Sequence, residues 1–247
     1  MVSKAVNVGA DGLLVKPASP RNIYDRVQSC IEGRKKFVVT ADYVGPDRRK
    51  SSRPGIDIPL LDVPNTLRMK ALGQWNAANG QEALAQGLVG LREQKARRNA
   101  FQVPFLIEFA LPGMRSNPPD QMALEHLERV PAVVSDLERR YMPGELDHRV
   151  ETACKALAAL MDRIRKSEGG TALDADLLQL QKLSYALLKG VYSTRSIDDL
   201  RREVNAAVGM YRKRLEEAAA AKAAEQAAAA EAAKAAAEPA PAAAAKP

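Results

Sequence analysis

The residues with the clearest chemical potential lie near the N-terminus, in residues 9–20. There, the apolar run at residues 13–15 stops at Lys16-Pro17, a pattern that predicts a short strand buried on both faces. A lysine at the end of such a strand presents an ammonium group that stays charged near neutral pH and neutralises anionic oxygens. Doubly wound α/β sheets bind ligands at the carboxyl ends of their strands, so Lys16 is the first candidate site residue.

A helix is predicted directly after this turn, over residues 20–33. Ser19 suits the N-cap position and Pro20 the first helical position, while Gly33 is a typical helix end. Apolar residues follow at helical spacing: Ile23, Val27 and Ile31. A buried strand that ends in a cation, a Pro turn and an amphipathic helix together predict the last βα unit of a doubly wound sheet.

The Gly-Ala-Asp turn at residues 9–11, the apolar run, Lys16-Pro17 and the helix start closely resemble the closing segment of the receiver domain of two-component response regulators, a CheY-like phosphoacceptor module. The resemblance implies that residues 13–15 are its fifth strand and residues 20–33 its fifth helix. It further implies that Lys16 pairs with the phosphorylated aspartate and that the peptide before Pro17 is cis, which costs about 0.5–1 kcal/mol. The alternative is an ordinary βα unit with an incidental Lys-Pro pair.

The rest of a receiver domain has no counterpart here. The acidic pair, the acceptor aspartate and the Ser or Thr of the family precede this segment, whereas residues 1–8 match the end of the preceding helix. We therefore expect residues 1–33 to be a receiver domain truncated at its N-terminus, with a start codon set inside a longer gene; a decayed domain is the alternative. The intact family binds Mg²⁺, but its acidic ligands are absent here, so no cofactor and no phosphoryl uptake are expected.

The amino-acid composition argues against several classes of protein. Only 4% of the 247 residues are aromatic, and the abundance of Ala and Leu favours helices. Cys30 and Cys154 lack the paired spacing of a zinc site or a disulfide framework, which predicts a reducing cytoplasm. No apolar run approaches 18 residues, so no membrane span is expected.

The net charge of +7 lies in the middle of the chain, because residues 34–118 carry 14 basic and 7 acidic side chains. Residues 34–66 are predicted to be a basic, Pro-rich linker, with a possible brief strand at residues 37–40. Within it, Arg48, Arg49 and Lys50 either contact an acidic partner or nucleic acid, or are solvated linker residues.

Residues 67–117 are predicted to be a connecting region with one helix, marked by Leu84, Leu88 and Leu91. Residues 101–109 are β-prone and contain Pro104, which a central strand does not tolerate. This apolar segment either packs on a neighbouring domain or forms the site where a partner docks.

From residue 118 to residue 217, four apolar stripes at helical spacing predict an antiparallel four-helix bundle with short joints at residues 143–144, 169–170 and 193–196. A coiled-coil dimer is the alternative, because the 3-4 spacing is also a heptad seam. Pro131 should bend the first helix. Residues 218–247 predict an Ala-rich helix to about Glu238, followed by a disordered Ala/Pro tail.

The predicted fold class is thus mainly α: a remnant of a doubly wound receiver domain with one strand and flanking helices, then a helical bundle. His126 and His148 have neighbours that partly match phosphotransfer histidines, although ordinary histidines are the simpler interpretation. The sequence favours a response-regulator fragment in phosphorelay signalling, whose protein partners would be a histidine kinase or a phosphotransfer protein. A non-catalytic helical adaptor is the alternative, and nucleic-acid binding rests on charge alone. No nucleophile-base pair or phosphate-binding Gly loop suggests an enzyme.

Overall fold

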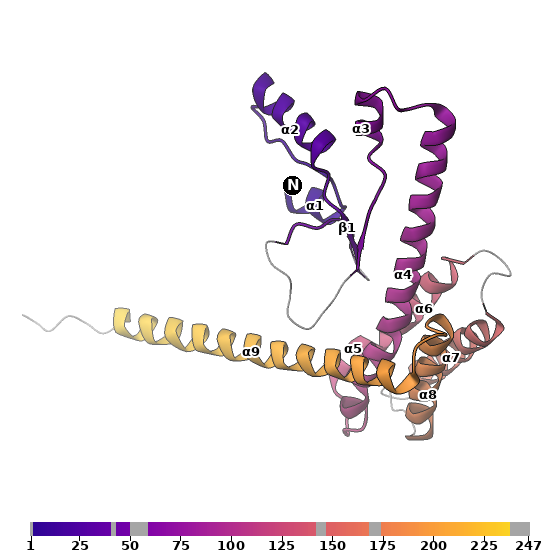
Figure 1. Ribbon diagram of the computed structural model, residues 1–247. Coiled ribbons are helices and arrows are strands. Elements are labelled where there is room, and N and C mark those ends of the chain that lie inside the picture. Colours follow the sequence, from indigo (N-terminus) through magenta and orange to yellow (C-terminus); the bar gives the residue numbers. More distant parts are fainter. Residues whose placement is uncertain (1, 41–42, 50–58, 142–146, 168–173, 238–247) are drawn as a thin grey trace, which may run out of the picture.

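The computed structural model describes residues 2–40, 43–49, 59–141, 147–167 and 174–237, with residues 230–237 described through their backbone alone. The chain is mainly helical, and a small three-stranded sheet lies between its N-terminal helices and its C-terminal bundle (Figure 1). Lys50, the joints at residues 143–144 and 169–170 and the predicted tail beyond residue 237 lie outside the described residues.

The first two helices are α1 (Val2–Asn7) and α2 (Pro20–Glu32). The hydroxyl of Ser19 accepts a hydrogen bond from the backbone N–H of Asn22 at 3.1 Å and caps α2, and Gly33 ends it. The helix predicted after the Lys-Pro turn is therefore confirmed, one residue shorter than expected.

The prediction of a strand at residues 13–15 is wrong, because these residues pair with no strand in the described part of the chain. A parallel strand needs at least one neighbouring strand with which to exchange backbone hydrogen bonds. Residues 13–15 have no such neighbour among the described residues, so the segment forms no ladder.

The segment predicted to be a linker instead forms the sheet. Strands β1 (Phe37–Val39), β2 (Val44–Pro46) and β3 (Leu60–Leu61) are antiparallel, in the order β2-β1-β3. The brief strand predicted at residues 37–40 is confirmed, and Val39 at its end is fully buried. The prediction of an irregular linker is therefore wrong for these residues, because the consecutive residues Val38 and Val39 are both buried in the sheet.

The connecting region holds α3 (Thr66–Ala71) and α4 (Ala77–Met114), a helix of 38 residues. The β-prone segment at residues 101–109 is part of α4, so the expectation of a non-helical segment is wrong. Pro104 removes one backbone hydrogen bond at a cost of about 3 kcal/mol. Burial of the surrounding apolar side chains offsets that cost, because Val103, Leu106 and Ile107 are 0–1% exposed.

The C-terminal helices match the predicted stripes. They are α5 (Gln121–Glu128), α6 (Val130–Glu138), α7 (His148–Lys166), α8 (Asp174–Val191) and α9 (Ile197–Ala237). The first predicted helix is broken between α5 and α6. Pro131 falls in the first turn of α6, where a missing backbone donor is tolerated.

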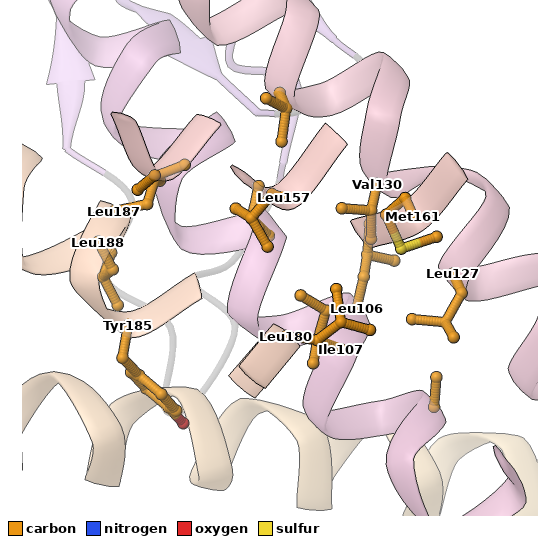
Figure 2. Packing of buried hydrophobic residues seen from close by; sticks show 14 of the residues in the cluster. Leu106, Ile107, Leu127, Val130, Leu157, Met161, Leu180, Tyr185, Leu187 and Leu188 are labelled. Carbon is orange, nitrogen blue, oxygen red and sulfur yellow. The ribbon is translucent and has the colours of Figure 1, made fainter. Parts of the chain in front are cut away.

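The second half of α4 is the central helix of the bundle, which the sequence had placed outside it. It packs against α5, α6, α8 and α9. Figure 2 shows side chains of several helices converging on this core: Leu106 and Ile107 of α4, Leu127 and Val130 of the α5–α6 corner, Leu157 and Met161 of α7, and Leu180 of α8. Beyond the bundle, α9 continues as a projecting rod (Figure 1), as predicted, and residues 216–229 are exposed.

One face of the first half of α4 is made of glycines that receive the preceding chain. A Cβ atom at any of them would crowd a side chain of residues 61–75: 2.2 Å from the Trp75 ring at Gly80, 2.9 Å from Pro64 at Gly87 and 3.2 Å from Leu61 at Gly90. Residues 61–75 therefore lie directly against α4, and glycine permits the close approach.

Candidate functional site

Lys16 is exposed at the turn between the extended segment and α2. The Lys16–Pro17 peptide bond is cis. Among the residues that the structure describes, no carboxylate forms an ion pair with the Lys16 ammonium. The candidate lysine is thus available to an anion from outside this set of residues.

The Gly-Ala-Asp turn is packed against the sheet. Gly9 adopts a φ of +82°, and a Cβ on it would lie 2.2 Å from the carbonyl oxygen of Val44 in β2. Only glycine combines the left-handed backbone with this close approach. The turn therefore fixes the chain just before Lys16 to the edge of the sheet.

Arg34, which the sequence analysis did not identify as a site residue, holds this arrangement together. Its guanidinium makes two hydrogen bonds to the carboxylate of Asp11, at 2.9 Å and 3.1 Å, and donates to the carbonyl oxygen of Pro64 at 2.7 Å. The same group lies 5.0 Å from the centre of the Phe37 ring. The planar fork of arginine suits this bidentate contact, which joins three separate segments.

The basic segment meets the same turn. Arg48 donates a hydrogen bond to the carbonyl oxygen of Ala10, and Arg49 forms a bidentate pair with Asp47 at 2.8 Å and 2.9 Å. The hydrogen bond from Arg49 lowers the pKa of Asp47 to about 2. The guanidinium groups of Arg48 and Arg49 are thus both engaged by hydrogen bonds within the chain, although Arg48 is exposed, which weakens the case for a free polyanion-binding patch.

Apolar side chains on both sides of Lys16 are uncovered. Leu14 is 43% exposed and Val15 72%, while Ile23 and Val27 of α2 are 46% and 44% exposed. Neither α1 nor α2 has a buried residue. The apolar segment before Lys16 and the amphipathic helix after it are therefore both left without a covering layer of described residues.

A buried polar network, which the sequence did not reveal, joins the sheet to the bundle. The Lys95 ammonium donates to the carbonyl oxygen of Thr40 at 3.0 Å, and the amide of Asn99, 2% exposed, donates to Asp136 at 2.7 Å. Arg140 bonds both oxygens of Asp136. Burial raises the pKa of Asp136, but hydrogen bonds from Asn99 and Arg140, with the charges of Arg140 and Lys95, lower it overall. These side chains position helices rather than expose a reactive group.

The two histidines lie in different settings. His126 is buried, its ring 4.3 Å from that of Phe109, with Nδ1 2.7 Å from the carbonyl oxygen of Met122 and Nε2 3.4 Å from the Tyr211 hydroxyl. His148 is exposed at the first residue of α7. His126 thus serves packing between α4, α5 and α9.

An open groove of about 680 Å³ lies between α7 and the α5–α6 corner. Its lining includes the apolar residues Pro131 and Ala159 and the acidic residues Glu128 and Asp162. The hydrogen bond from Lys166 lowers the pKa of Asp162. No nucleophile with an adjacent base lines this groove.

Within the described ranges, no cluster of three or more His, Cys, Asp or Glu residues is arranged to hold a metal ion. None of the described helices has the length and apolar character needed to span a membrane. Comparisons of the chain with protein-family models, with curated proteins and with solved structures found no match.

Proposed function

We propose that the chain is a non-catalytic cytoplasmic signalling protein, in which the C-terminal part of a receiver-type unit is joined to a helical interaction domain. The observation that carries this proposal is the uncovered apolar surface of residues 13–15 and α2, on either side of Lys16. Burying apolar surface is favourable by about 25 cal/mol for each Å² removed from water, so a second layer that covers this surface would be stabilising. A βα unit separated from its sheet neighbours has this property.

The proposed role of Lys16 follows from the resemblance to receivers. Its ammonium would neutralise a phosphorylated aspartate supplied by a complementing segment, because no described carboxylate pairs with it. The acidic ligands of Mg²⁺ would come from that segment as well. The chain would then act in a phosphorelay together with a histidine kinase or a phosphotransfer protein.

The test uses the chain and a longer polypeptide that includes the sequence encoded directly upstream in the same frame. Each is incubated with a small acyl phosphate and Mg²⁺, and acid-labile phosphate is measured by mass spectrometry. We expect phosphate on the longer polypeptide alone. Its formation and loss should be slower in Lys16→Gln and unchanged in Lys35→Gln, which replaces another exposed lysine. The proposal would be contradicted if the longer polypeptide gained no phosphate, or if Lys16→Gln left the rates of phosphate gain and loss unchanged.

A non-catalytic helical adaptor is the second candidate. The exposed apolar side chains Leu84, Leu88 and Val89 in the first half of α4, far from Lys16 in sequence, favour it, because exposed apolar side chains offer contacts to another protein. An in-frame stop codon directly upstream of Met1 would favour the adaptor function over the receiver-type signalling function.

A further inference from the structure

The last packed turns of α9 lie against a break in the hydrogen-bond ladder of α4. Pro112 lies inside α4 and has no backbone N–H, so the carbonyl oxygen of Glu108, four residues earlier, lacks its usual helical donor. Arg212 of α9 supplies a donor from outside the helix. Its Nη2 donates to the carbonyl oxygens of Glu108 at 3.3 Å and Phe109 at 3.1 Å, and its guanidinium lies 5.5 Å from the centre of the Phe109 ring.

Tyr211, the residue before Arg212, completes this contact. Its ring meets those of Phe105 and Phe109 edge-on, with centres 5.6 Å and 5.1 Å apart, and its hydroxyl lies 3.4 Å from Nε2 of His126 in α5. Tyr211 and Arg212 together form what we term the latch. Residues 216–229 are exposed, so the latch lies where α9 leaves the bundle and the projecting rod begins (Figure 1).

Gly209 lies two residues before the latch, at a position where packing does not require a glycine. A Cβ on Gly209 would have nothing within 4 Å, whereas a Cβ on Gly80, Gly113 or Gly190 would lie 2.2 Å, 2.7 Å or 2.3 Å from a neighbouring side chain. Glycine inside a helix disfavours the helical state about fivefold relative to alanine. The packed form of α9 therefore gains nothing from Gly209, whereas a bend at this position does, because glycine adopts non-helical backbone angles at little cost.

We propose that α9 is a hinged lever: the latch holds the rod in one direction, and the helix bends at Gly209 when the latch opens. Residues before the hinge stay packed in both states, because Leu200, Val204 and Val208 are only 0–6% exposed. Opening the latch turns the rod away from α4 and uncovers the rings of Phe105 and Phe109. A short hinge of this kind changes the direction of an element without unfolding it. This inference does not depend on the phosphorelay proposal.

The first experiment measures the direction of the rod by pulsed dipolar electron spin resonance of the full chain. Nitroxide labels are attached at Leu178→Cys in α8 and Ala224→Cys in the rod, both exposed positions, in a Cys30→Ser background in which Cys154 is buried. We expect one dominant distance between the labels. Arg212→Ala should add a second distance, because the ratio of open to latched molecules should rise on the order of tenfold when a charged donor to two carbonyl groups is lost.

Two further variants control this measurement. Arg214→Ala removes an exposed arginine two residues further on and should leave the distances unchanged. Arg212→Lys keeps the positive charge but lacks the planar fork, so it should give a smaller second population than Arg212→Ala. Circular dichroism of each variant measures whether its helix content is retained.

The second experiment tests the position of the hinge. Gly209→Ala, added to Arg212→Ala, should reduce the second population about fivefold, because alanine favours the helical state at the bend. Asn205→Ala is the matched control. It also introduces alanine at an exposed position of α9, but on the packed side of the hinge, so it should leave the second population unchanged.

Four results would overturn the proposal. The first is an unmodified chain without one dominant distance, and the second is a pair of Arg212 variants whose distances match those of Arg214→Ala. The third is a second population that Gly209→Ala reduces no more than Asn205→Ala does. The fourth is a loss of helix content in both Arg212 variants, because the rod would then unfold rather than turn.

Discussion

Replacing Arg34 by alanine should detach the Gly-Ala-Asp turn from the sheet. The pair with Asp11 is partly exposed, at 23% and 38% for the two side chains, so it contributes about 0.5–1 kcal/mol. The hydrogen bond from a charged donor to Pro64 adds about 1.5 kcal/mol, and the contact with Phe37 about 0.5 kcal/mol. The sum is about 2.5–3 kcal/mol, which corresponds to an opening constant about 70–160 times larger.

Native-state hydrogen exchange of the β1 amides measures this opening directly. Arg34→Ala should lower their protection by that factor, and Arg34→Lys should recover only part of it, because lysine lacks the planar fork. Arg21→Ala is the control, since Arg21 and Asp25 are 84% and 54% exposed and their pair contributes only a few tenths of a kcal/mol. Equal effects of Arg34→Ala and Arg21→Ala would refute the assignment of Arg34 as the residue that joins these segments.

Two further predictions concern packing inside the chain. Gly209→Ala, whose new Cβ has nothing within 4 Å, should raise the free energy of unfolding by about 0.5–1 kcal/mol, whereas Gly80→Ala should lose this gain. Trp75 is the single tryptophan, and in Gly80→Ala its fluorescence emission should also shift to longer wavelength because its ring is displaced. If Gly80→Ala stabilised the protein as much as Gly209→Ala and caused no shift, the close contact would be contradicted. Burial raises the pKa of the Cys154 thiol to about 12, so alkylation of the native protein near pH 8 should modify the partly exposed Cys30 first. Mass spectrometry that finds both cysteines alkylated at the same rate would contradict this order.

Local signals in the sequence predicted much of the helical structure. The cap at Ser19 and the stop at Gly33 defined α2, and the apolar stripes after residue 118 defined the C-terminal helices, because caps and helical periodicity act over a few residues. The helix through Pro104 was missed for the opposite reason. Its stability depends on burial by distant helices, which outweighs the local preferences of its residues.

The candidate site was only partly predictable. Lys16 and the cis turn were identified from a motif, whereas Arg34 was not, because its partners Asp11 and Pro64 lie 23 and 30 residues away along the chain. The glycine face of α4 was missed for a related reason. A glycine in a helix signals close approach only when the approaching segment is known.

The exchange of the backbone amides at residues 13–15 and in α2 tests the central claim most directly. The claim is that this surface is complete only when a further layer covers it. We predict low protection in the chain as a monomer and strong protection when the sequence encoded upstream is attached, because parallel neighbours then accept the hydrogen bonds of the extended segment. Strong protection of these amides in the monomeric chain alone would contradict the account.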